Sequence, residues 1–110
     1  MIFNQNGNTS IITQEKVSVV ELVKKLQTLY PKFKNHNIIV ALHSLDAFKE
    51  SEIAEFLQLS NKHKAAKHSF VIVSNKIDLD VVPDELIVVP TLLEAHDIIE
   101  MEDMERDLDF

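Results

Sequence analysis

The side chain best placed for chemistry is Ser51, which stands between Glu50 and Glu52 where a helix is predicted to begin. A phosphate on a serine at a helix amino terminus meets free backbone N–H groups and the positive end of the helix dipole. The two flanking carboxylates would repel the charge that phosphorylation adds. The same hydroxyl also suits a simple N-cap. Both interpretations, a modification site and a helix cap, stay open.

The five histidines raise the question of a metal site. His43 and Asp46 flank a predicted turn, and His96 and Glu100 are spaced i, i+4 on a predicted helix. A closed transition-metal site needs three or four converging ligands. Since no local spacing supplies more than two, the sequence predicts no metal and no cofactor, and His96 is expected to be a partly buried core residue.

No arrangement of nucleophile, base and orienting acid is visible in the sequence. The chain has no cysteine, and Gly7 is its only glycine. Phosphate-binding loops and the Gly-x-Ser-x-Gly elbow both need several glycines. The paired carboxylates lie in a stretch expected to be exposed, where burial cannot shift their pKa values. We therefore expect a protein that is not an enzyme.

Charge and composition narrow the class of partner. The formal net charge is −7, and residues 94–110 hold eight acids and one arginine, so the remainder is neutral. An acidic end disfavours binding to phosphate backbones and favours a basic protein partner. The absence of cysteine, of a long apolar run and of a signal-peptide pattern predicts a single cytoplasmic domain, residues 1–110, with an acidic C-terminal helix or tail.

The predicted turn that carries Ser51 follows a buried strand, residues 37–44. Residues 38–42 form an uninterrupted apolar run, which suits a strand covered on both faces. In an open α/β sheet, the turn at the carboxyl end of such a strand usually presents the working surface. We therefore expect the turn at 44–52 to be exposed and to lead into a helix over 51–64.

Other segments frame this strand. A β-hairpin that turns at Asn6 and Gly7 is predicted for residues 1–13, and short strands are predicted for residues 69–74 and 86–89. Residues 75–85, between these two strands, fit either a loop or an irregular extended segment.

Two capping boxes mark helix starts, at residues 18–21 and 91–94. The first of these helices is expected to end or kink near Tyr30, because the residue before Pro31 is pushed out of the helical region.

The helix over 51–64 carries inward-facing and basic residues. The residues expected to face inward are Ile53, Phe56, Leu57 and Ser60. The basic residues at its end are Lys62, Lys64 and Lys67, bracketed by His63 and His68. This cluster suits a charged cap that complements the helix dipole, and the alternative is an RNA-binding patch.

The last helix carries two apolar stripes on roughly opposite faces. One consists of Leu92, Ala95, His96 and Ile99, and the other of Leu93, Met101, Met104 and Leu108. A straight helix can dock only one of them on a sheet. Either the tail bends so that its methionines fold back on the body, or the second stripe receives a partner.

The order hairpin, helix, buried strand, helix, strand, strand, helix resembles the STAS domain, the fold of bacterial anti-sigma-factor antagonists. In that family a hydrophobic-Asp-x-hydrophobic segment precedes Asp-Ser-Ser-Gly, and residues 41–53 align with it without a gap. The matching residues are Leu42, Leu45, Asp46, Phe48 and Ile53. Ser51 falls where the family places its phosphorylated serine, and Lys49, Glu50 and Glu52 replace the residues around it. The resemblance implies a mixed α/β sheet of about five strands with three main helices.

A second resemblance concerns residues 89–102, which are similar to the end of small Bacteroidetes-type proteins often labelled ribonuclease Z. That enzyme needs a His-x-His-x-Asp-His metal motif, which this sequence lacks. The resemblance therefore implies association with the nuclease rather than its chemistry.

These observations predict a cytoplasmic protein-interaction module, monomeric or weakly dimeric, with a regulatory partner such as an anti-sigma factor. The alternatives are an accessory protein for ribonuclease Z and a sensor of a nucleotide or lipid. The expected partner-binding residues are Ser44, Asp46, Phe48, Lys49, Glu50, Ser51, Glu52, Met101, Met104 and Leu108.

Overall fold

The protein is described by a computed structural model, which covers residues 2–13, 19–42, 54–75, 80 and 82–108. Its centre is a five-stranded sheet in which the strands lie side by side in chain order. The first two strands are antiparallel and all other neighbours are parallel. The strands are β1 (Ile2–Asn6), β2 (Thr9–Thr13), β3 (Asn37–Ala41), β4 (Phe70–Val73) and β5 (Ile87–Val89).

The β1–β2 hairpin turns one residue later than the sequence predicted. Asn6 pairs with Thr9, so the two loop residues are Gly7 and Asn8. Gly7 has a φ of 62°, which places the glycine at the first loop position, as in a type II′ turn. The register shifts because only Gly7 accepts this backbone conformation without steric cost.

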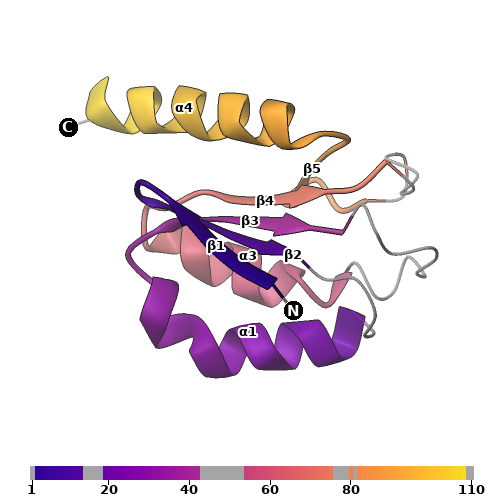
Figure 1. Cartoon of the computed structure of the whole chain (residues 1–110). Coiled ribbons are helices and arrows are strands. Elements are labelled where there is room, and N and C mark those ends of the chain that lie inside the picture. The colour runs from indigo at the N-terminus through magenta and orange to yellow at the C-terminus, as the bar shows by residue number, and fades with distance from the viewer. Residues whose placement is uncertain (1, 14–18, 43–53, 76–79, 81, 109–110) are drawn as a thin grey trace.

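The strand β3 is the middle strand of the sheet, and all five of its residues are buried. Its side chains alternate between two cores: Ile38 and Val40 pack on one side, and Ile39 and Ala41 on the other. Helices cover both faces, with α1 (Val19–Phe33) and α3 (Leu57–Ala65) on one side and α4 (Leu92–Leu108) on the other (Figure 1). The prediction of a central strand covered on both faces is confirmed.

The helix α1 does not end near Tyr30. It continues through Pro31 to Phe33, which is 2% exposed and whose ring stacks on Phe3 at a centroid distance of 5.7 Å. Burial of this aromatic side chain is worth more than the backbone hydrogen bond that proline cannot donate. The expected cap at residues 18–21 begins outside the described residues.

The helix α3 ends in a Schellman motif. The His68 N–H donates to the His63 carbonyl at 3.2 Å and the Lys67 N–H to the Lys64 carbonyl at 2.9 Å, while Lys67 adopts a left-handed φ of 66°. α3 therefore ends at Ala65, one residue beyond the predicted end, but it begins at Leu57, after a turn at Glu55 and Phe56. The prediction of one continuous helix from 51 to 64 is wrong, and residues 51–53 lie outside the described residues. Backbone N–H groups thus cap the carboxyl end of α3, which is also the end that carries the predicted basic cluster.

Candidate interaction surfaces

The inner side of α4 is anchored on the sheet by apolar contacts. Ala95 and Ile99 are buried against β3 and β4, and Ile98 packs partly against the same core. The helix begins as predicted, because the Thr91 hydroxyl accepts a hydrogen bond from the Glu94 N–H at 3.2 Å. His96 is half-buried, whereas Leu92 of the same predicted stripe is 36% exposed.

A polar cluster holds the later turns of α4 against the amino ends of β3 and β4. Arg106 donates to Ser69 Oγ at 3.1 Å, to Asn37 Oδ1 at 3.4 Å and to Asp103 Oδ1. Asn37 Nδ2 donates to Asp103 Oδ2 at 3.3 Å, and Ser69 Oγ donates to Glu102 Oε1 at 2.5 Å. We call these five residues the polar clamp. The clamp engages two half-buried C-terminal acids, Glu102 and Asp103, in contacts within the chain, whereas the sequence suggested an acidic tail free for a partner.

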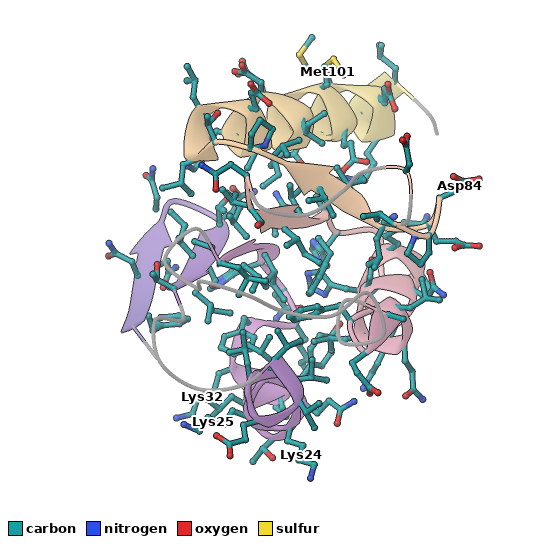
Figure 2. The ribbon with its side chains drawn as sticks, turned by 90° about the vertical axis from the view of Figure 1, so that its right-hand side faces the viewer. Lys24, Lys25, Lys32, Asp84 and Met101 are labelled. Carbon is teal, nitrogen blue, oxygen red and sulfur yellow. The ribbon has the colours of Figure 1, made fainter. Side chains whose placement is uncertain are left out.

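The outer side of α4 carries the second apolar stripe, whose side chains are exposed to solvent. Leu93, Met101, Met104 and Leu108 are 72%, 55%, 58% and 82% exposed, and we call them the outer stripe. Met101 projects away from the sheet (Figure 2). Because α4 runs unbroken to Leu108, the bent tail with methionines folded onto the body is wrong. The exposed acids beside the stripe are Glu94, Asp97, Glu100, Glu105 and Asp107.

The other predicted contact, the turn at residues 44–52, lies outside the described residues. This segment includes Ser44, Asp46, Phe48, Lys49, Glu50, Ser51 and Glu52, so the roles expected of these residues stay predictions. The structure does describe the end of the strand that precedes this turn. The turn follows Leu42, which is fully buried and donates its N–H to the Val73 carbonyl at 2.8 Å, at the carboxyl end of the central strand.

Sequence reasoning missed the buried His63. Its side chain is fully buried in α3, accepts a hydrogen bond from the Tyr30 hydroxyl at Nδ1 (2.7 Å) and donates from Nε2 to the His36 carbonyl (2.6 Å). Burial lowers its pKa from 6.5 to about 4, and the neighbouring His68 and Arg106 act in the same direction. The available signal was its spacing from Phe56, Leu59 and Ser60, all of which are buried on the same side of the helix.

The described part of the chain holds neither a metal-binding cluster nor a membrane-spanning helix. No group of three His, Asp or Glu side chains in that part is arranged to hold a metal ion. Likewise, none of its helices combines the length and apolar character needed to cross a membrane.

No family model matches the sequence, and no curated protein shows significant similarity to it. The fold, however, is similar to that of RsbS from Moorella thermoacetica, solved as a variant with glutamate in place of a serine. The TM-score is 0.65 at 11% identity, covering 96% of this chain and 97% of RsbS. The chain has the STAS-domain fold.

A second STAS-domain structure of the same arrangement comes from the stressosome, described as a signal integration and transduction hub. Its TM-score is 0.59 at 10% identity, covering 90% of this chain and 96% of the other. At these identities the proteins share the backbone arrangement rather than their side chains. The predicted STAS-like α/β fold is confirmed, and neither structure bears on the ribonuclease Z alternative.

Proposed function

We propose that this STAS-like chain is a cytoplasmic regulatory module that acts by binding a protein partner and catalyses no reaction. The observation that carries the proposal is the outer stripe of α4. Four large apolar side chains are presented on a helix whose inner side is fixed by Ala95, Ile99 and the polar clamp. A rigidly held apolar surface needs little ordering when a partner binds, so more of the contact energy appears as affinity.

The chemistry of the stripe defines the partner. Methionine side chains are unbranched and polarizable, which lets Met101 and Met104 adapt to an apolar partner surface. The exposed acids beside them would attract a basic rim and speed association, whereas the apolar contact would slow dissociation. The partner that fits is a protein with an apolar patch bordered by lysine or arginine.

The turn at residues 44–52 is proposed as a second contact, with Ser51 as its regulatory position. The similarity to RsbS and to a signal-integration assembly supports a regulatory partner, such as an anti-sigma factor, for this chain. Phosphate on Ser51 would add about two negative charges beside Glu50 and Glu52 and so would change partner choice at this turn. Phos-tag electrophoresis of the chain from growing and stressed cells tests this, and an unmodified Ser51 in every condition removes the switch.

Affinity capture with matched variants tests the outer stripe. Gln is close to Met in shape and helix propensity, so Met101→Gln with Met104→Gln removes apolar character while keeping the helix. We expect this variant to lose the partner and the control, Met101→Leu with Met104→Leu, to retain it. Capture of a regulatory protein by the native chain supports the proposal, and capture of ribonuclease Z supports the accessory role. Equal capture by the Gln and Leu variants contradicts a role for the stripe.

Substitution is a cleaner test than truncation after Glu100. Removing residues 101–110 deletes Glu102, Asp103 and Arg106, and with them three members of the polar clamp. A truncated chain would therefore lose the partner through a loosened α4 as readily as through the missing stripe.

A further inference from the structure

The outward side of α1 has a charge opposite to that of α4. Three lysines, Lys24, Lys25 and Lys32, are exposed on this helix together with one acid, Glu21, so its outward side carries a net positive charge. Together with the exposed Val20 and with Thr28, the lysines form what we call the basic face. Figure 2 shows the three lysines at one end of the molecule and Met101 at the other, with the sheet between them. The described chain is thus acidic on one outer helix and basic on the helix that covers the opposite face.

The basic face is also hollowed. Lys24, Lys25, Thr28 and Leu29 line a shallow groove of about 320 Å³. The aliphatic stems of lysines cover apolar surface while their ammonium groups stay in water, so the groove is apolar at its floor and cationic at its rim. This combination, an apolar patch bordered by lysines, is the partner chemistry deduced above for the outer stripe of α4.

We propose that the outer stripe of one copy docks on the basic face of a second copy, head to tail. This inference rests on the proposed function, because it names a partner for the same surface. Met101 or Met104 enters the groove beside Leu29, and Lys24 and Lys25 face the acids that border the stripe. Since the two surfaces lie on opposite sides of the molecule, each added copy leaves one surface of each kind free.

Charge selects this pairing over the symmetric ones. An α4-to-α4 contact would oppose Asp97, Glu100 and Glu105 to the same acids of the other copy. An α1-to-α1 contact would oppose two surfaces of net positive charge, because the three exposed lysines outnumber Glu21. Like-charge juxtaposition is costly at an interface, so only the head-to-tail contact joins opposite charges.

The size of the contact sets its strength. The two helices have 15 and 17 residues, which makes them about 22 and 25 Å long. A single helix-on-helix contact of this length lies at the small end of specific interfaces, so the association should be weak and reversible. Because its charges are exposed, it should weaken as salt is raised from about 0.05 to 0.5 M.

Sedimentation velocity over a range of protein concentrations, at low and high salt, tests the proposal with two complementary variants. Lys24→Glu with Lys25→Glu destroys the basic face, and Met101→Gln with Met104→Gln destroys the stripe. We expect the native chain to form a concentration-dependent series of oligomers and each variant alone to weaken association about tenfold or more. An equimolar mixture of the two variants should recover a dimer and nothing larger, because each species keeps one intact surface. The control, Lys34→Glu with Lys67→Glu, changes net charge equally outside α1 and should assemble as the native chain does.

Three outcomes would overturn head-to-tail assembly: a native chain that stays monomeric at every concentration and salt, variants that assemble like the native chain, or a mixture that forms no dimer. The proposed function is judged separately by affinity capture. If capture still distinguishes the Gln from the Leu variant while the native chain is monomeric, the stripe binds another protein and only the self-assembly is wrong.

Discussion

The Tyr30 hydroxyl donates a 2.7 Å hydrogen bond to Nδ1 of His63, and the two rings meet nearly edge to face at a centroid distance of 5.5 Å. This contact ties α1 to α3 beneath the sheet. The histidine is neutral there, since its Nε2–H is committed to the His36 carbonyl and burial lowers its pKa. Burial also raises the pKa of the Tyr30 phenol, so the hydroxyl remains a donor at neutral pH.

Tyr30→Phe should lower the free energy of unfolding by about 1–3 kcal/mol, because it leaves a buried histidine nitrogen without its donor. Urea unfolding measures this. Thr28→Val is the control: it removes an exposed hydroxyl of the same helix, bonded to the Lys24 carbonyl, and should cost under about 0.5 kcal/mol. If the two substitutions lower the free energy of unfolding equally, the buried hydrogen bond adds no more stability than the exposed one.

Acid should destabilise the fold through His63. Its pKa is about 4 in the folded chain and 6.5 when unperturbed, so between these values the unfolded chain binds more protons. Stability from this group is therefore complete above pH 6.5 and is lost as the pH falls toward 4, by up to about 3 kcal/mol. An NMR titration of the His63 ring protons, with urea unfolding at each pH, measures both quantities. A folded-state pKa near 6.5 would sink the prediction.

Asn37→Ala should cost about 1–3 kcal/mol, because the buried Ser69 N–H donates to Asn37 Oδ1 at 2.8 Å and would lose its acceptor. The substitution also opens the polar clamp, so amide hydrogen exchange in the last turns of α4 should accelerate. Unfolding and exchange measurements on Asn35→Ala, an exposed neighbour, provide the control and should match the native chain. If exchange in α4 is unchanged in Asn37→Ala, the clamp does not hold the helix end.

Lys67→Gly should stabilise the chain by about 1 kcal/mol, because Lys67 occupies the left-handed position of the Schellman motif, where a side chain costs energy. Thermal unfolding gives the shift. Lys67→Ala keeps the strain while removing the charge, so it should show no such gain. A comparable increase with alanine would assign the effect to charge instead of backbone conformation.

Local patterns in the sequence were enough to predict much of the fold. The apolar run at residues 38–42 predicted the central strand, and the capping threonine at 91 predicted where α4 begins. These features depend on residues within a few positions of each other, and the periods of strand and helix convert them directly into buried faces. Even the two stripes of α4 were visible in this way.

The parts that the sequence did not determine depend on contacts between distant residues. Pro31 was expected to end or kink α1 near Tyr30, but the helix continues to Phe33, which packs against Phe3, thirty residues away. By sequence, His63 was expected beside a basic cluster at a helix end. In the structure, it is a buried core residue that is hydrogen-bonded to Tyr30 and to the His36 carbonyl. By sequence, Arg106 and Asp103 were part of an acidic tail. In the structure, both form hydrogen bonds with Asn37 and are members of the polar clamp. Periodicity tells which residues share a face, but only tertiary packing decides what that face meets, because burial and long-range hydrogen bonds outweigh local preferences.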